Sequence, residues 1–199
     1  YIGIQLGQIV SNDSTRMHDV IIERNYLQGA AGGGNGIRVV GNDVTVRNNI
    51  IDLTAASGDT GVQADSSTAG MAAPIRTSIY NNTIFRSDAA GFVAVRLLAG
   101  GSGHIVNNNL GYAPSSTSRT MVSDSATGTV GASGTFGNSS NAQILASPNF
   151  SNGGGPFDTP TDFNLLGGSY ALNTGVAVPV FSDFFGVSRP PGLGVDIGA

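Results

Sequence analysis

Apolar and polar residues alternate over short stretches of this chain. In residues 43–51, which read DVTVRNNII, Val44 and Val46 alternate with Thr45 and Arg47. A period of two places successive side chains on opposite faces of an extended backbone and is typical of a half-buried β-strand. The pattern therefore predicts short strands separated by turns. Related patterns occur in residues 19–27, 77–84 and 104–110.

The four segments share an asparagine and the aliphatic residues around it, which indicates one repeat. The shared asparagines are Asn25, Asn49, Asn82 and Asn108, at spacings of 24, 33 and 26 residues. Three positions before them lie Ile22, Val46, Ile79 and Ile105, and two positions after them lie Leu27, Ile51, Ile84 and Leu110. Asparagine tolerates the left-handed backbone of a tight turn. We expect the buried amides to bond from repeat to repeat, which is a structural role.

A third short segment, usually beginning at a glycine, precedes each repeat. These segments are residues 3–7, 36–41, 61–65 and 91–98. Three short strands in a repeat of about 24 residues form one coil of a parallel β-solenoid. A single coil cannot bury its apolar face, so stacking of coils creates the core. The spacing of 33 residues indicates an insertion, which we place at residues 66–74.

Two repeats, VTVRNNIIDL and SIYNNTIF, resemble the asparagine-turn repeats of bacterial secreted right-handed parallel β-helix proteins, the group that includes polysaccharide lyases. Residues 162–199 are similar to the closing segment of those proteins. The matching positions are Asp162, Phe163, Leu165, Asp183, Gly186, Arg189, Pro190, Asp196, Ile197, Gly198 and Ala199. The resemblance implies an all-β, right-handed parallel β-helix with three short strands per coil and a C-terminal cap. It also implies that the chain is the C-terminal part of such a protein, with upstream coils missing.

We divide the chain into two parts of one domain. Residues 1–112 hold the regular coils, and residues 113–199 hold irregular coils followed by the capping segment. Within the irregular part, strands are expected near residues 119–124 and 141–146. The capping segment is expected to cover the last open coil, because a bare coil end is an unpaired sheet edge that invites aggregation.

Outward positions of stacked coils form columns, and a column on the first strand of each coil is the candidate site. Gln5, Arg38 and Gln63 fall in this column, and we expect Arg96 to lie near Asp65, one coil away. In the enzymes that the chain resembles, this face often lines the sugar groove. The five residues are therefore the predicted substrate-binding residues, with arginine holding a uronate or sulfate through bidentate hydrogen bonds. The alternative is that they form the polar outer face that any solenoid presents.

The other polar residues considered are expected to have structural roles and no role in binding or catalysis. Glu23, Arg47 and Tyr80 form an outward column on the second strand, where Glu23 and Arg47 are expected to make a surface ion pair. Such a pair contributes less than about 1 kcal/mol to stability. His104 is expected in another outward column, and His18 in the turn before a strand. We expect neither histidine to be catalytic, because an isolated histidine in a turn is more often structural.

Composition excludes several classes of function. The net charge is −4 and there is no basic run, which argues against nucleic-acid binding. No apolar run reaches the roughly 18 residues of a membrane-spanning helix. The 199 residues include no cysteine, so a thiolate metal site is excluded. We expect no cofactor; the one metal considered is Ca²⁺ at residues 52–59, bound by Asp52, Asp59 and carbonyl oxygens.

The sequence assigns no catalytic residues. The chain has no lysine to serve as a lyase base, and both the paired-Asp motif of β-helix hydrolases and the Asp-Pro-His motif of β-helix epimerases are absent. We predict an extracellular or cell-surface carbohydrate-active or carbohydrate-binding β-helix protein, similar to a polysaccharide lyase or hydrolase if catalytic. Its partner would be a polysaccharide, in particular an acidic one. The alternative is a non-catalytic structural, adhesive or filament-forming β-solenoid that self-associates end to end through its N-terminal coil.

Overall fold

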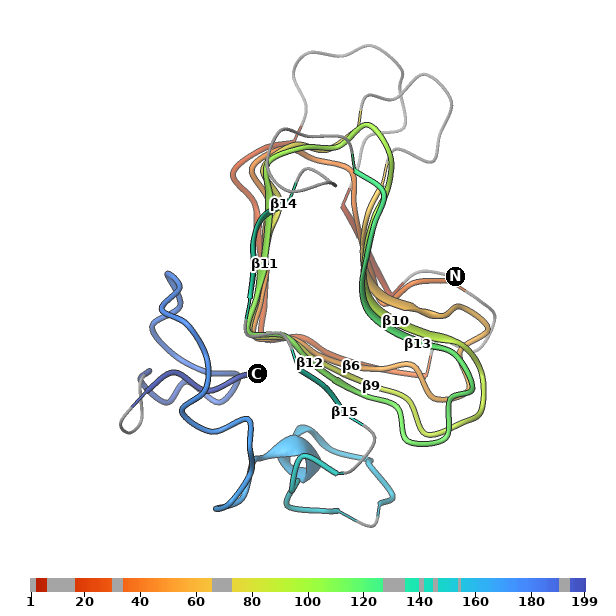
Figure 1. The fold of residues 1–199 in the computed structure, drawn as a ribbon, viewed down its shortest axis with the longest axis vertical. Coiled ribbons are helices and arrows are strands. Elements are labelled where there is room, and N and C mark those ends of the chain that lie inside the picture. The colour runs from red at the N-terminus through yellow and green to blue at the C-terminus, as the bar shows by residue number, and fades with distance from the viewer. Residues whose placement is uncertain are drawn as a thin grey trace.

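The described part of the chain folds into a parallel β-helix of five stacked coils (Figure 1). The computed structural model describes residues 3–6, 17–29, 34–65, 73–126, 135–139, 142–144, 147–153, 155–189 and 194–199. Every strand pairs in parallel with the equivalent strand of the next coil. The predicted all-β, right-handed parallel β-helix with three short strands per coil is therefore confirmed.

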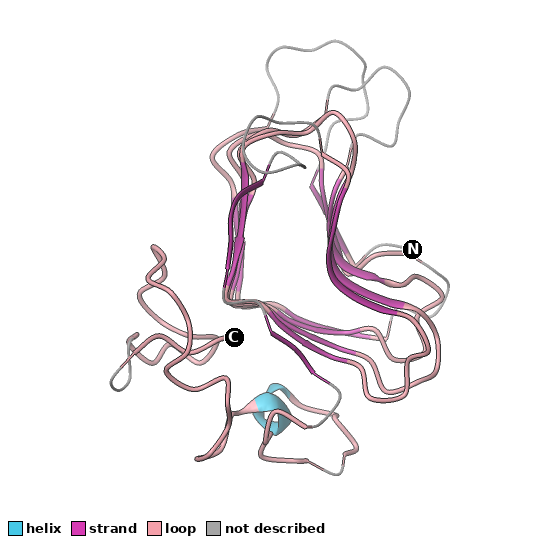
Figure 2. Ribbon diagram, in the orientation of Figure 1, coloured by secondary structure: helices cyan, strands magenta, loops and turns pink. Residues whose placement is uncertain are grey.

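Each of the three sheets takes one strand from every coil. The first sheet contains β1 (Ile4–Leu6), β4 (Ile37–Val39), β7 (Thr60–Ala64), β10 (Phe92–Leu97) and β13 (Arg119–Asp124). The second contains β2 (Ile21–Glu23), β5 (Thr45–Arg47), β8 (Ser78–Tyr80), β11 (His104–Asn107) and β14 (Thr135–Ser139). The third contains β3 (Tyr26–Gln28), β6 (Ile50–Asp52), β9 (Thr83–Phe85), β12 (Leu110–Tyr112) and β15 (Ala142–Ile144). Turns and loops connect the strands, and a short 3₁₀ helix, η1 (Pro160–Phe163), follows them (Figure 2).

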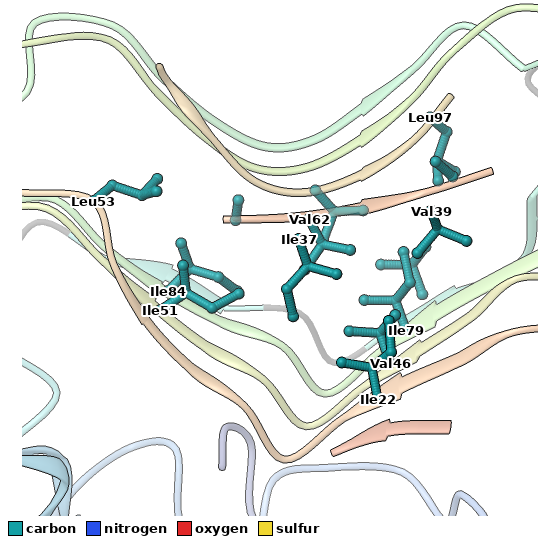
Figure 3. Packing of buried hydrophobic residues seen from close by; sticks show 14 of the residues in the cluster. Ile22, Ile37, Val39, Val46, Ile51, Leu53, Val62, Ile79, Ile84 and Leu97 are labelled. Atoms are coloured by element: carbon teal, nitrogen blue, oxygen red, sulfur yellow. The ribbon is translucent and has the colours of Figure 1, made fainter. Parts of the chain in front are cut away.

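Aliphatic side chains that alternate with polar ones along the strands fill the interior (Figure 3). The register of β2, β5 and β8 aligns Ile22, Val46 and Ile79 in one inward column. Ile37 and Val62 are aligned in the same way from the first sheet. All five are at most 7% exposed. Because one coil alone would leave these groups open to water, hydrophobic burial ties each coil to its neighbours.

Asparagine side chains bond from coil to coil at the turn between the second and third sheets. Nδ2 of Asn25 donates to Oδ1 of Asn49, Asn49 donates likewise to Asn82, and Asn82 to Asn109, each at 2.9 Å. Each of these amides also donates to one or more backbone carbonyls. The residue before each ladder asparagine takes the left-handed conformation, with φ between 50° and 57°. The predicted ladder is therefore confirmed for its first three members.

The fourth member of the ladder is Asn109 and not the predicted Asn108. β11 pairs with β8 so that Val106, and not Ile105, lies opposite Ile79. Val106 is fully buried, whereas Ile105 is partly exposed. Asn108 occupies the left-handed position before the ladder residue, with φ of 57°. Three consecutive asparagines make the two registers look alike in sequence, and packing in the core decides between them.

The C-terminal segment, residues 147–199, includes the part that the sequence predicts as a cap. It packs along the flank of the coils and not over the end of the last one (Figure 1). It contacts both the first coil and the fourth coil. The Tyr26 hydroxyl of the first coil donates to the Phe157 carbonyl at 3.3 Å, and Asn108 Nδ2 of the fourth coil donates to the Val176 carbonyl at 2.8 Å. The segment therefore crosses the coils along the solenoid axis.

The C-terminal segment lies there because the third sheet is apolar on its outer face as well as its inner one. A second hydrophobic cluster joins Ile50, Phe85, Leu110 and Tyr112 of this sheet to Phe150, Phe157, Phe163, Ala171 and Ile197 of the segment. The rings of Phe85 and Phe163 lie 5.5 Å apart in an edge-to-face arrangement. Full burial of a large apolar side chain is worth roughly 1.5–3 kcal/mol, so this cluster holds the segment against the sheet.

Of the remaining predictions on the chain's organisation, some are confirmed and others fall on residues outside the described ones. The strands expected near residues 119–124 and 141–146 are found as β13 and β15. The insertion falls between β7 and β8, and its residues 66–72 lie outside the described residues. In the closing segment, Arg189 donates to the carbonyls of Asp196 (3.0 Å) and Gly198 (2.8 Å), while Pro190 lies outside the described residues.

Replacing one ladder amide should destabilise the fold. Asn49 is fully buried, and Asn49→Ala would leave backbone groups of two coils without partners. We expect the free energy of unfolding to fall by about 1–3 kcal/mol, measured by denaturant unfolding followed by circular dichroism. Gln5→Ala, which removes an exposed amide, is the control. A loss below about 0.3 kcal/mol, within the error of the extrapolation, would contradict the structural role of the ladder.

Candidate functional site

The outward face of the first sheet carries the polar column that the sequence predicts. The register of β1, β4 and β7 places Gln5 beside Arg38 and Arg38 beside Gln63. Arg96 continues the same column, because β7 and β10 pair without a bulge and Arg96 lies opposite Gln63. The sequence predicts Arg96 near Asp65, and the register places Arg96 directly opposite Gln63, two residues before Asp65. The four side chains form one row, with neighbours separated by the strand spacing of about 4.8 Å.

Asp65 lies two residues beyond Gln63 and anchors the middle of the row. Its carboxylate accepts a hydrogen bond from Gln63 Nε2 at 2.8 Å and lies 3.1 Å from an Nη atom of Arg38. Gln63 Oε1 in turn accepts a hydrogen bond from Asn35 Nδ2 at 2.8 Å. The side chain of Asp65 is 2% exposed and that of Arg38 is 14% exposed. This network is therefore largely shielded from water, which strengthens its hydrogen bonds and holds the side chains in one geometry.

One donor of this network is left without a partner. The Nε atom of Arg38 is buried and makes no hydrogen bond within the part of the chain that the structure describes. A buried N–H group without a partner costs about 1–3 kcal/mol.

The row, together with the two aspartates that pair with its arginines, is called the strip from here on. The second of these aspartates is Asp59, which pairs with Arg96 and which the sequence does not predict at this site. Arg96 Nη2 donates to Asp59 Oδ2 at 2.8 Å, and the two side chains are 27% and 43% exposed. Partial burial raises the pKa of Asp59, but the hydrogen bonds from Thr60 and Arg96 together lower this pKa by more than burial raises it. The carboxyl group therefore titrates below its usual range. Asp59 lies in the turn before β7, where no strand periodicity applies. The sequence therefore holds no signal for its position.

The outward column of the second sheet is a structural feature. Glu23 and Arg47 make the predicted ion pair, with 2.7 Å between Arg47 Nε and Glu23 Oε2. Tyr80, expected to face outward, is only 5% exposed. The C-terminal segment crosses the solenoid next to it, where Asn81 Nδ2 donates to the Asp196 carbonyl at 2.8 Å. This face is therefore partly covered by the protein's own chain.

His104 is buried in the interior of the fourth coil, which corrects its predicted place in an outward column. The register that turns Val106 inward also turns His104 inward, where Nδ1 accepts the Thr77 backbone N–H at 3.2 Å. The side chain is 0% exposed. Burial lowers the pKa of His104 to about 4, against a smaller opposing effect of Asp124. A neutral imidazole enclosed in the core has no access to a molecule bound outside.

The two aspartates predicted as calcium ligands make separate contacts. Asp52 Oδ1 accepts the backbone N–H of Thr54 at 2.8 Å, and burial raises the pKa of Asp52. Asp59 pairs with Arg96. Among the residues that the structure describes, no three His, Asp or Glu side chains gather closely enough to share a metal ion. In the same residues, no helix has the length and apolar character needed to span a membrane.

Comparison of the chain with protein-family models, with curated proteins and with solved structures found no match. The β-helix architecture therefore stands on the structure itself. What the chain binds has to be inferred from the chemistry of its own surface.

Acidification should destabilise the protein through His104. Its pKa is about 4 in the folded state and about 6.5 in an unfolded chain, so the unfolded state binds more protons between these values. Stability should be unaffected by this group above about pH 7 and should fall by up to about 3 kcal/mol as the pH drops toward 4. Urea unfolding at a series of pH values measures this loss.

Two variants separate His104 from the other imidazole. His104→Gln keeps an acceptor in reach of the Thr77 N–H and should flatten the pH dependence between pH 4 and 7. His18 lies at the surface with its Nδ1 atom 2.7 Å from the Asp19 carboxylate, and His18→Gln is the comparison variant that removes the other imidazole. An unaltered dependence in His104→Gln would contradict the assignment.

Proposed function

We propose that the protein is an extracellular or cell-surface carbohydrate-binding β-helix, related to the secreted polysaccharide-active proteins that it resembles. The supporting observation is the row formed by Gln5, Arg38, Gln63 and Arg96, in which four coils each supply one hydrogen-bonding side chain. Stacked repeats create extended binding surfaces of this kind. A polymer lying along the solenoid axis is the ligand whose repeating groups suit such a row.

The chemistry of the row favours an acidic polysaccharide. The planar guanidinium groups of Arg38 and Arg96 are suited to bidentate hydrogen bonds with carboxylate or sulfate. The side chain of Arg96 is 27% exposed and that of Arg38 is 14% exposed. Asp65 and Asp59 hold these two groups in place, so that little side-chain freedom would be lost on binding.

Binding is better supported than bond cleavage. A glycoside hydrolase needs one carboxyl group that retains a proton and a second that is ionised. The pKa of Asp59 is lowered, and its carboxylate pairs with Arg96. The Asp65 carboxylate is occupied by Gln63 and Arg38. Since both carboxylates of the strip are engaged with donors, we assign the strip no proton transfer.

A structural role is the second candidate, and one observation favours it. The two arginines of the strip are balanced by Asp59 and Asp65, so the net charge of the site is zero and its ion pairs already link neighbouring coils. On this alternative the strip reinforces the solenoid of an adhesive or filament-forming protein. Coils would then join end to end through β1, β2 and β3, which are edge strands of the described sheets.

Arginine substitutions in the strip test the proposed function. Arg96→Gln should weaken the binding of hexagalacturonate or a sulfated hexasaccharide by about tenfold or more, because a hydrogen bond to a charged group is lost. Isothermal titration calorimetry measures the change. Arg47→Gln is the matched control, since Arg47 is also paired with a carboxylate but lies on the second sheet. Arg38→Gln is a second variant, with circular dichroism to verify folding because Asp65 would lose its cation.

The result also separates the two candidates. Equal affinity of Arg96→Gln and the unaltered protein would contradict binding at the strip. Failure of both acidic oligosaccharides to bind, together with filaments in negative-stain images of the purified protein, would favour the structural alternative.

A further inference from the structure

A cleft lies on another face of the solenoid than the strip, between the third sheet and the C-terminal segment. Its volume is about 560 Å³, within the range of small-molecule sites. One wall comes from the strand ends of β3, β6 and β9 and the turns that follow them, and the other comes from residues 155–158. None of the five residues of the first-sheet prediction lines it.

The wall formed by residues 155–158 is fixed to the coils. The Phe157 carbonyl accepts hydrogen bonds from Gln28 Nε2 at 3.1 Å and from the Tyr26 hydroxyl at 3.3 Å. Burial, together with three nearby carboxylates, raises the pKa of Tyr26 to about 12, so its hydroxyl remains a donor at neutral pH. The rings of Phe157 and Phe85 have their centroids 4.4 Å apart. The cleft is therefore formed before any ligand arrives, which lowers the entropic cost of binding.

The lining combines hydrogen-bonding oxygens with an aromatic ring. The carboxylate of Asp52 is buried in the wall, while Asp158 is exposed on the opposite side. The hydroxyls of Thr54 and Ser87 lie 3.1 Å apart, and each keeps further capacity for hydrogen bonds. Phe157 is half-buried and contributes apolar surface. Ligand sites commonly place a few polar groups around an apolar surface in this way.

The cleft carries carboxylates that no arginine of its described lining balances, whereas the strip has no net charge. Asp52 and Asp158 line it, and no arginine or histidine does so among the described residues. A carboxylate or sulfate ligand would be repelled and would lack a cationic partner. Hydroxyl donors, in contrast, match the carboxylate and hydroxyl acceptors that line this space.

We infer that this cleft binds an uncharged sugar unit, whose hydroxyls donate to Asp52 and Asp158 while one face of the ring lies against Phe157. The inference rests on the proposed carbohydrate-binding function and extends it to a second face. The strip on the first sheet takes acidic units, and the cleft beside the third sheet takes neutral ones.

Titration with neutral and acidic oligosaccharides tests the inference. The probes are the gluco-, manno- and galacto-configured neutral hexaoses, with hexagalacturonate as the acidic counterpart. We expect at least one neutral hexaose to bind, and Asp158→Asn to weaken it by about tenfold or more through loss of a charged acceptor. Ser87→Trp replaces an exposed side chain with one that fills the cleft and should abolish this binding. Asp19→Asn, an exposed aspartate in the turn before β2, is the matched control.

The two proposals fail in different ways. The inference is supported if a neutral hexaose binds more weakly to Asp158→Asn, does not bind to Ser87→Trp, and binds to Asp19→Asn and Arg96→Gln as it does to the unaltered protein. The inference is overturned if a neutral hexaose still binds to Ser87→Trp, or if none of the three neutral hexaoses binds to the unaltered protein. Hexagalacturonate binding that is unaffected by Arg96→Gln overturns only the function proposed for the strip. Circular dichroism of each variant verifies folding.

Discussion

Hydrogen bonds between stacked asparagine side chains hold the first four coils in register with one another, and the other features of the structure depend on that alignment. Asn49 illustrates the arrangement, because its carbonyl oxygen accepts from both the backbone and the side chain of Asn25 while its amide donates to Asn82. Side chains of a strand alternate between faces, so a slip of one residue would turn every inward group outward. The ladder and the aliphatic core specify the same register, and this agreement favours a single fold.

The polar strip of the first sheet is a direct consequence of this register. Parallel pairing without a bulge brings Arg38, Gln63 and Arg96 side by side on successive coils. Asp65 from a strand end and Asp59 from a turn then pair with the two arginines. The strip is rigid but has no net charge. Recognition of a ligand there would rest on the geometry of the hydrogen-bond donors, and long-range electrostatic attraction would add little.

The third sheet explains both the place of the C-terminal segment and the cleft beside it. Its strands bury apolar side chains on two faces, as Ile51 does toward the core and Ile50 toward the segment. The segment covers the outer face with aromatic rings, and a cleft remains at the seam where residues 155–158 meet the strand ends. Two segments that are far apart in the chain thus build one lining, which neither would form alone.

The sequence by itself determined the β-helix, its three strands per coil, the column of Gln5, Arg38 and Gln63, and the pairing of Glu23 with Arg47. These features follow from a period of two and from repeats about one coil apart, both of which are local patterns. Only the tertiary structure decided that Asn109 belongs to the ladder and that His104 faces the core. Local sequence leaves a one-residue choice there, and packing against the coil before it settles that choice.

Contacts between distant parts of the chain also decided the position of Asp59, which the sequence did not predict, and that of the closing segment, which the sequence placed at the end of the last coil. Asp59 reaches Arg96 from a turn, and turns carry no periodic signal from which a direction could be read. The closing segment looks like a cap in sequence, but its place on the flank depends on the apolar outer surface of Ile50, Phe85 and Leu110. That surface exists only after the coils have stacked. Local alternation determined which residues could face inward, and contacts between distant parts of the chain decided what covers the faces that remain.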